Sequence, residues 1–189
     1  AAEFNERNFT PAAVGAAISN AKNRLQDADA FASQAGDFYA RSIARAYRAY
    51  EEILRSNDAL DFDDLLFVTA RLLRGDEMVR RELQQRYQYL LIDEYQDTNH
   101  AQFLIAAALA ADNRNIGVVG DPDQSIYAWR GADIRNILEF EQQYPEAEVV
   151  ALGQNFRSTG HIVAAADQLI RHNRHRKHKP LHTELGDGE

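Results

Sequence analysis

Three short runs of apolar residues, separated by segments of helical pattern, place the strongest limit on how this chain folds. The runs cover residues 89–92, 115–119 and 147–152. A short continuous apolar run is typical of a strand that is buried on both faces of a sheet. Strands that alternate with helices are joined by right-handed crossovers and form a parallel sheet. The sequence therefore predicts an α/β core with three parallel strands. The intervening helices are expected over about 99–111, 134–144 and 159–173.

The N-terminal part of the chain has a different pattern. Through residues 11–57 the apolar side chains recur at helical spacing, and Thr10 before Pro11 is a favourable helix start. A further helix is expected to begin near Asp61, with carboxylates in its first turn where the helix dipole favours them. We therefore expect an all-helical appendage, residues 1–57, and an α/β core, residues 58–189.

Composition limits the class of protein. The 189 residues include no cysteine, which excludes disulfides and thiolate metal sites, and no apolar run is long enough to cross a membrane. The net charge of −8 argues against a general polyanion binder, so any contact with nucleic acid must be a local track. The lack of cysteine is compatible with a reducing cytoplasm, and no membrane partner is expected. The first residues carry no signal pattern. Because the first residue is not methionine, we expect a piece of a longer chain.

Two carboxylates follow the first apolar run, at Asp93 and Glu94. In an open α/β sheet, ligands bind beyond the carboxyl ends of the strands. One carboxylate at such a position is suited to hold Mg²⁺, and its neighbour is suited to orient and deprotonate an attacking water. The alternative is that Asp93 only caps the next helix.

An aromatic segment follows the second run. Tyr127, Trp129 and Arg130 come shortly after a Gly-Asp-Pro-Asp turn that begins at Gly120. Aromatic rings beside an arginine suit unpaired nucleic-acid bases, because stacking tolerates any base sequence. A buried core tryptophan is the structural alternative. Together with the carboxylate pair, this segment predicts nucleotide hydrolysis coupled to a strand of DNA or RNA.

Four segments carry a resemblance to a known family. Residues 93–97, 120–133 and 154–159 resemble motifs II, III and IV of the UvrD/PcrA/Rep-type superfamily 1A DNA helicases, and 60–65 is similar to the segment before motif II. The resemblance implies that the core is a partial RecA-like (P-loop NTPase) parallel sheet with flanking helices. It makes the appendage part of subdomain 1B. The core becomes the C-terminal part of subdomain 1A, ending near the hinge to 2A.

The resemblance also implies roles for single residues. Asp93 would bind Mg²⁺, Glu94 would be the catalytic base, and Gln124 would contact the γ-phosphate of ATP. Arg157 would be an arginine finger, an element worth roughly 10³–10⁵ in rate. Phe156 would flank the adenine at a position where many relatives have tyrosine. A turn hydrogen bond for Gln124 and a surface ion pair for Arg157 remain alternatives.

On the nucleic-acid side, the resemblance implies that Trp129 and Tyr127 touch single-stranded DNA. Arg130 would contact a phosphate or pair internally. Expected partners are single-stranded DNA, junctions of single- and double-stranded DNA, the remaining subdomains of the helicase chain and repair proteins. In addition, residues 21–24 could reach phosphates or form a solvated face, and the basic segment 171–179 is expected to be a phosphate-facing or solvated linker.

No phosphate-binding loop of the form G-x-x-x-x-G-K-[ST] is present, since none of the ten glycines is followed by lysine. We therefore expect an internal fragment that is inactive alone, from an ATP-dependent 3′-to-5′ DNA helicase that acts in repair or replication. The helicase subunit of a helicase–nuclease complex is the nearest alternative. A nucleic-acid-binding module that has lost hydrolysis and a metal-dependent nuclease that uses Asp93, Glu94 and Asp97 come next.

Overall fold

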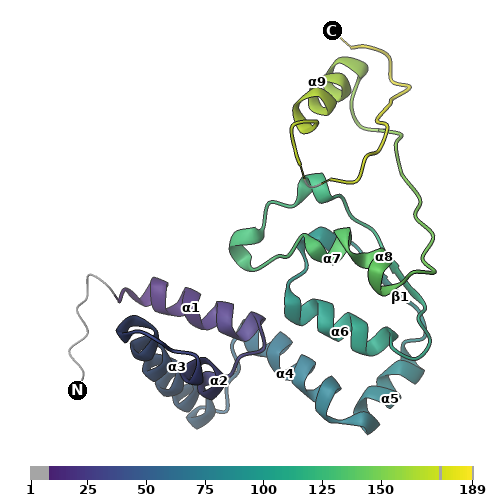
Figure 1. Cartoon of the computed structure of the whole chain (residues 1–189). Helices are drawn as coiled ribbons and strands as arrows, with labels where there is room; N and C mark the ends of the chain where they lie inside the picture. The colour runs from purple at the N-terminus through teal and green to yellow at the C-terminus, as the bar shows by residue number, and fades with distance from the viewer. Residues whose placement is uncertain (1–8, 175, 189) are drawn as a thin grey trace.

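The computed structural model describes residues 9–174 and 176–188 and shows a helical part followed by a mixed helix and strand part (Figure 1). The helical part contains α1 (Pro11–Asn23), α2 (Ala28–Ser33), α3 (Phe38–Ser56), α4 (Phe62–Gly75) and α5 (Glu77–Arg86). Next come β1 (Leu90–Ile92), η1 (Tyr95–Asp97), α6 (His100–Ala110), β2 (Ile116–Val118), η2 (Pro122–Gln124) and η3 (Ala128–Arg130). The chain ends with α7 (Arg135–Leu138), α8 (Phe140–Gln143) and α9 (Gly160–Ile170).

Side-chain caps start the N-terminal helices where the sequence predicts. Thr10 caps α1 with Pro11 in the first turn, and Asp61 forms a reciprocal capping box with Asp64 at the start of α4. Apolar faces of α1, α2 and α3 meet in a small core. Its buried members are Ile18, Ala21, Ala28 and Tyr47. Within residues 9–174 and 176–188, every helix is too short or too polar to span a membrane.

The sheet has two parallel strands, with Leu90 opposite Ile116 and Ile92 opposite Val118. Helices α7 and α8 cover one face, where a second core holds Tyr95, Ile137, Phe140 and Tyr144. The expectation of burial on both faces is wrong for the part of the chain described here. Leu91 points away from α7 and α8 and is 78% exposed.

Two expected elements differ from the structure. Residues 147–152 do not form a third strand, and their large apolar side chains are exposed. A strand needs a neighbour for its backbone groups, and within the described residues this segment meets one only beyond its end, where Gln154 bridges His182. The expected helix over 134–144 is interrupted at Glu139, which separates α7 from α8.

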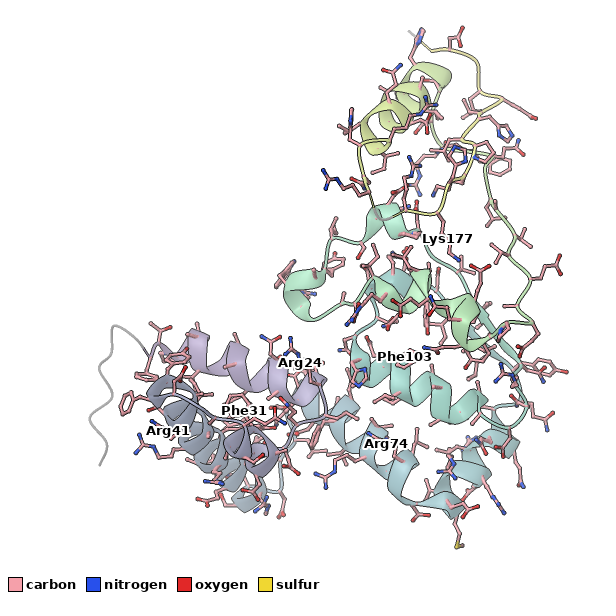
Figure 2. The ribbon with its side chains drawn as sticks, viewed as in Figure 1. Arg24, Phe31, Arg41, Arg74, Phe103 and Lys177 are labelled. Carbon is pink, nitrogen blue, oxygen red and sulfur yellow. The ribbon has the colours of Figure 1, made fainter. Side chains whose placement is uncertain are left out.

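The basic C-terminal segment folds back onto the acidic turn after β2. Arg176 lies 3.1 Å from Asp123, and Lys179 pairs with Asp121. Lys177, labelled in Figure 2, pairs with Glu141 on α8. The expectation of a solvated or phosphate-facing linker is therefore wrong for Arg176 and Lys179, whose side chains are largely covered and face carboxylates.

Candidate functional site

The carboxylate pair lies beyond the carboxyl end of β1. Asp93 and Glu94 are both exposed, and Glu94 adopts a left-handed backbone conformation with φ 49° and ψ 42°. The backbone N–H of Glu94 donates to Asp93 Oδ1 at 2.9 Å. A non-glycine residue in this conformation is uncommon, costs about 1–3 kcal/mol, and is one of the features that cluster at functional sites. The fold therefore presents both carboxylates to solvent at the edge where α/β sheets bind ligands.

A buried amide connects this pair to the turn after β2. Gln96 is 1% exposed, and its Nε2 donates to Glu94 Oε2 at 2.7 Å. Its Oε1 accepts the backbone N–H of Asp121 at 3.0 Å. Sequence reasoning assigned no role to Gln96, because its burial and its contact with the turn after β2 depend on the tertiary structure.

The Gln124 side chain is held within the same turn. Its Nε2 donates to Asp121 Oδ2 at 2.8 Å, and Lys179 donates to the same oxygen. Burial alone would raise the pKa of Asp121, but the hydrogen bonds from Lys179 and Gln124 outweigh it and lower the pKa below the usual value. The turn hydrogen bond that was the structural alternative for Gln124 is thus present. The contact of Gln124 with a phosphate stays a prediction.

The aromatic segment forms an exposed cluster. The ring centroids of Tyr127 and Trp129 are 6.4 Å apart, and the Arg130 guanidinium lies 4.6 Å from the Trp129 ring and 5.5 Å from the Tyr127 ring. Trp129 is 72% exposed, so it is not a core residue. Arg130 is exposed and contacts both rings in this structure, while its contact with a phosphate stays a prediction. Two rings and a cation together offer a stacking surface to solvent.

Phe156 and Arg157 lie apart from this network. Both are exposed, and Asn155 Oδ1 holds their turn by accepting the backbone N–H groups of Arg157 and Ser158 at 2.9 and 2.7 Å. Among the described residues, neither Phe156 nor Arg157 is hydrogen-bonded to Glu94 or Gln124. Their roles beside a nucleotide therefore stay predictions.

The residues present fit a magnesium ion that is shared with a nucleotide. Oxygen ligands suit Mg²⁺, and Asp93 Oδ2 is left without a hydrogen bond in the described structure. Across residues 9–174 and 176–188, no group of three or more histidine or acidic side chains is placed to hold a metal ion. Asp93 would therefore share the ion with phosphate oxygens and water.

The polar end of α1 has a structural role. Lys22 is buried, and its Nζ lies 2.8 Å from carboxylate oxygens of Glu51, Asp61 and Asp64. Burial alone would lower the pKa of Lys22, but these hydrogen bonds raise it. The expectation that Lys22 reaches a phosphate is therefore wrong. Arg24, labelled in Figure 2, is exposed.

Residues 1–145 match the family described as the UvrD/REP helicase N-terminal domain, which covers more than half of the chain. The chain therefore belongs to the UvrD/REP helicase family. It is 45% identical over 186 residues to the ATP-dependent DNA helicase PcrA of Staphylococcus epidermidis, across 98% of this chain and 26% of that protein. It is also 45% identical over 185 residues to the helicase of the same name from Bacillus subtilis, across 98% of this chain and 25% of that protein.

These comparisons also define what part of a relative this chain represents. It spans about a quarter of the length of the curated relatives that it matches. The matched family confirms the resemblance carried by motifs II and III, which lie within residues 1–145.

Proposed function

We propose that this chain is part of an ATP-dependent DNA helicase that moves 3′ to 5′ along single-stranded DNA in repair or replication. One observation carries the proposal: Glu94 is hydrogen-bonded through Gln96 to the turn that holds Gln124, and the same segment continues into the exposed Trp129. A hydrolytic site and a stacking surface are thus built on neighbouring parts of one scaffold. The names of the relatives, which are ATP-dependent DNA helicases, support the same assignment.

The chemistry follows from the residue types. Asp93 would hold Mg²⁺, which neutralises charge on the β- and γ-phosphates of bound ATP. Glu94 accepts a proton from the attacking water, a step for which an exposed carboxylate at a strand end is suited. Gln124 donates a hydrogen bond to the γ-phosphate. Arg157 stabilises its developing charge, and Phe156 packs beside the adenine.

On the DNA side, Trp129 and Tyr127 stack on unpaired bases, while Arg130 supports both rings. Partners would be single-stranded DNA, junctions with duplex DNA, repair proteins and the rest of the helicase chain. Residues 58–189 would complete a RecA-like domain 1A with other segments, and residues 1–57 would belong to subdomain 1B. We place the protein in the cytoplasm, at the nucleoid, where such a substrate is found.

Hydrolysis is tested by changing Glu94 to glutamine in the full-length protein. We expect ATP binding to persist and turnover to fall by at least about 10²-fold, the contribution typical of a general base. Glu148→Gln is the matched control, because Glu148 is also exposed and lies outside the site. Turnover that remains at the level of the control would exclude Glu94 as the base.

DNA stacking is tested by Trp129→Ala, with single-strand affinity measured by fluorescence anisotropy. The loss of one stacking ring should weaken binding by about 1–3 kcal/mol while ATP affinity stays the same. Phe62→Ala is the control, because Phe62 is an exposed ring on α4. Unchanged DNA affinity in Trp129→Ala would reject the stacking role. DNA binding without turnover in the unmodified protein would favour the binding-module alternative.

A further inference from the structure

Gln96 is buried and uses both ends of its side-chain amide beside the exposed carboxylates of Asp93 and Glu94. Nε2 donates to Glu94 Oε2 at 2.7 Å and lies 3.4 Å from Asp97 Oδ2, while Oε1 accepts from the backbone of Asp121. Its backbone carbonyl also accepts the hydroxyl of Ser125 at 3.4 Å. One buried, planar group therefore joins the segment after β1 to the segment after β2.

We propose that Gln96 is a positioning residue, which fixes the Glu94 carboxylate and couples it to the turn that carries Gln124. This inference rests on the proposed function, because it concerns how the base of that reaction is held. A glutamate side chain that is otherwise exposed has several rotatable bonds. The hydrogen bond from a buried donor restricts it to one orientation.

The two partners need a donor and an acceptor on one side chain, which the glutamine amide supplies. A carboxylate oxygen of Glu94 needs a donor, whereas the backbone N–H of Asp121 needs an acceptor. A glutamate at position 96 would place two carboxylates together, and an apolar residue would leave both groups without a partner. Glutamine therefore satisfies both groups, whereas glutamate or an apolar residue at this position does not.

The Gln96 amide lies against Gly120, where there is no room for a larger side chain. A Cβ on Gly120 would overlap Gln96 Oε1 and would lie 2.9 Å from Ile137 Cδ1. Glycine at position 120 thus lets the turn approach the amide closely enough for the hydrogen bond to Asp121. Two separate positions, 96 and 120, are matched to the same contact.

The connection continues beyond Asp121. Its Oδ2 accepts from Gln124 Nε2 at 2.8 Å, so a row of hydrogen bonds runs from Glu94 through Gln96 and Asp121 to Gln124. A shift of the turn that carries Gln124 therefore moves the group that holds Glu94. Loss of Gln96 should affect turnover and its stimulation by DNA more than it affects nucleotide binding.

The test compares Gln96→Glu and Gln96→Met with the unmodified full-length protein. For each, ATP turnover is measured with and without single-stranded DNA, together with KM for ATP and folding by circular dichroism. We expect kcat to fall on the order of 10²-fold, as for a displaced catalytic group, with KM changed less than about threefold. The stimulation of turnover by DNA should shrink toward one.

Gln84→Glu is the matched control. Gln84 is also buried, and its Nε2 donates to the Ala108 carbonyl at 2.7 Å, away from the carboxylate pair. Because the amide of Gln84 is structural only, its substitution should lower the stability of the protein. It should leave kcat per folded molecule and the stimulation by DNA unchanged.

Each result decides the inference. If a Gln96 variant folds and has the kcat and the DNA stimulation of the unmodified protein, the positioning role is overturned, even if Glu94→Gln is inactive. Full turnover in Glu94→Gln would instead remove the proposed base. If neither Gln96 variant folds while Gln84→Glu does, Gln96 is part of the structural core and the positioning role is rejected.

Discussion

Replacing Lys22 by methionine should open the junction between α1, α3 and α4. The side chain of Lys22 is fully buried, and carboxylates of Glu51, Asp61 and Asp64 surround its ammonium at 2.8 Å. Methionine keeps the length and volume of the lysine stem but removes the charge. The variant therefore leaves three carboxylates facing one another, with that of Asp64 nearly buried.

The expected size of the effect follows from burial. Removing one partner of a buried ion pair costs about 3–5 kcal/mol, because the remaining charge has no compensation. Since about 1.4 kcal/mol corresponds to a tenfold change in an equilibrium constant, local opening should become more frequent by on the order of 10²–10⁴-fold. Because the Glu51 and Asp61 side chains are partly exposed to solvent, the expected increase in opening lies toward the lower end of this range.

Native-state hydrogen exchange of the full-length protein measures this opening. Ala21 in α1 and Ala70 in α4 are buried residues of two helices that pack against each other, and their amides should exchange faster in Lys22→Met. Lys177→Met is the matched control, because Lys177 and its partner Glu141 have side chains that are 35% and 51% exposed. Such a pair is worth about 0–1 kcal/mol. Equal exchange in the two variants would refute the argument from burial.

Two further predictions concern the same regions. Burial alone would raise the pKa of Asp61, but hydrogen bonds from Lys22 and other neighbours lower it. Its contribution to stability should therefore be present above about pH 4 and be lost as the pH falls through the lowered pKa, which unfolding measured from pH 7 to pH 3 would show. Gly120→Ala should cost about 1–3 kcal/mol, because the added Cβ overlaps Gln96. Gly15→Ala in α1, where no atom lies within 4 Å of the new Cβ, should instead stabilise by about 1 kcal/mol. Equal thermal shifts for the two alanine variants would contradict this reasoning.

Local chemistry made the helix starts and two of the strands predictable. Thr10, Pro11 and the aspartates of α4 satisfy backbone groups within the next turn, so their effect depends only on near neighbours in the chain. The apolar runs at 90–92 and 116–118 pair with each other as expected. The carboxylate pair is where motif and strand together predict it, at the end of β1.

Contacts between distant segments decided the rest. The apolar run at 147–152 has the composition of a strand, but a strand also needs a neighbouring backbone, which no local pattern supplies. Lys22 and the basic side chains at 176–179 appear from the sequence to be free for phosphates. The fold pairs them instead with carboxylates 29 to 58 residues away.

Gln96 shows the same division between local and tertiary causes. Its place in the motif follows from the sequence, but its burial and both of its hydrogen bonds depend on how the segments after β1 and β2 meet. The sequence alone determined the chemical groups available and the helices and strands that carry them. Only the tertiary structure decided which of these groups remain exposed to a ligand and which are held by one another, because burial and pairing energies depend on contacts far apart in the chain.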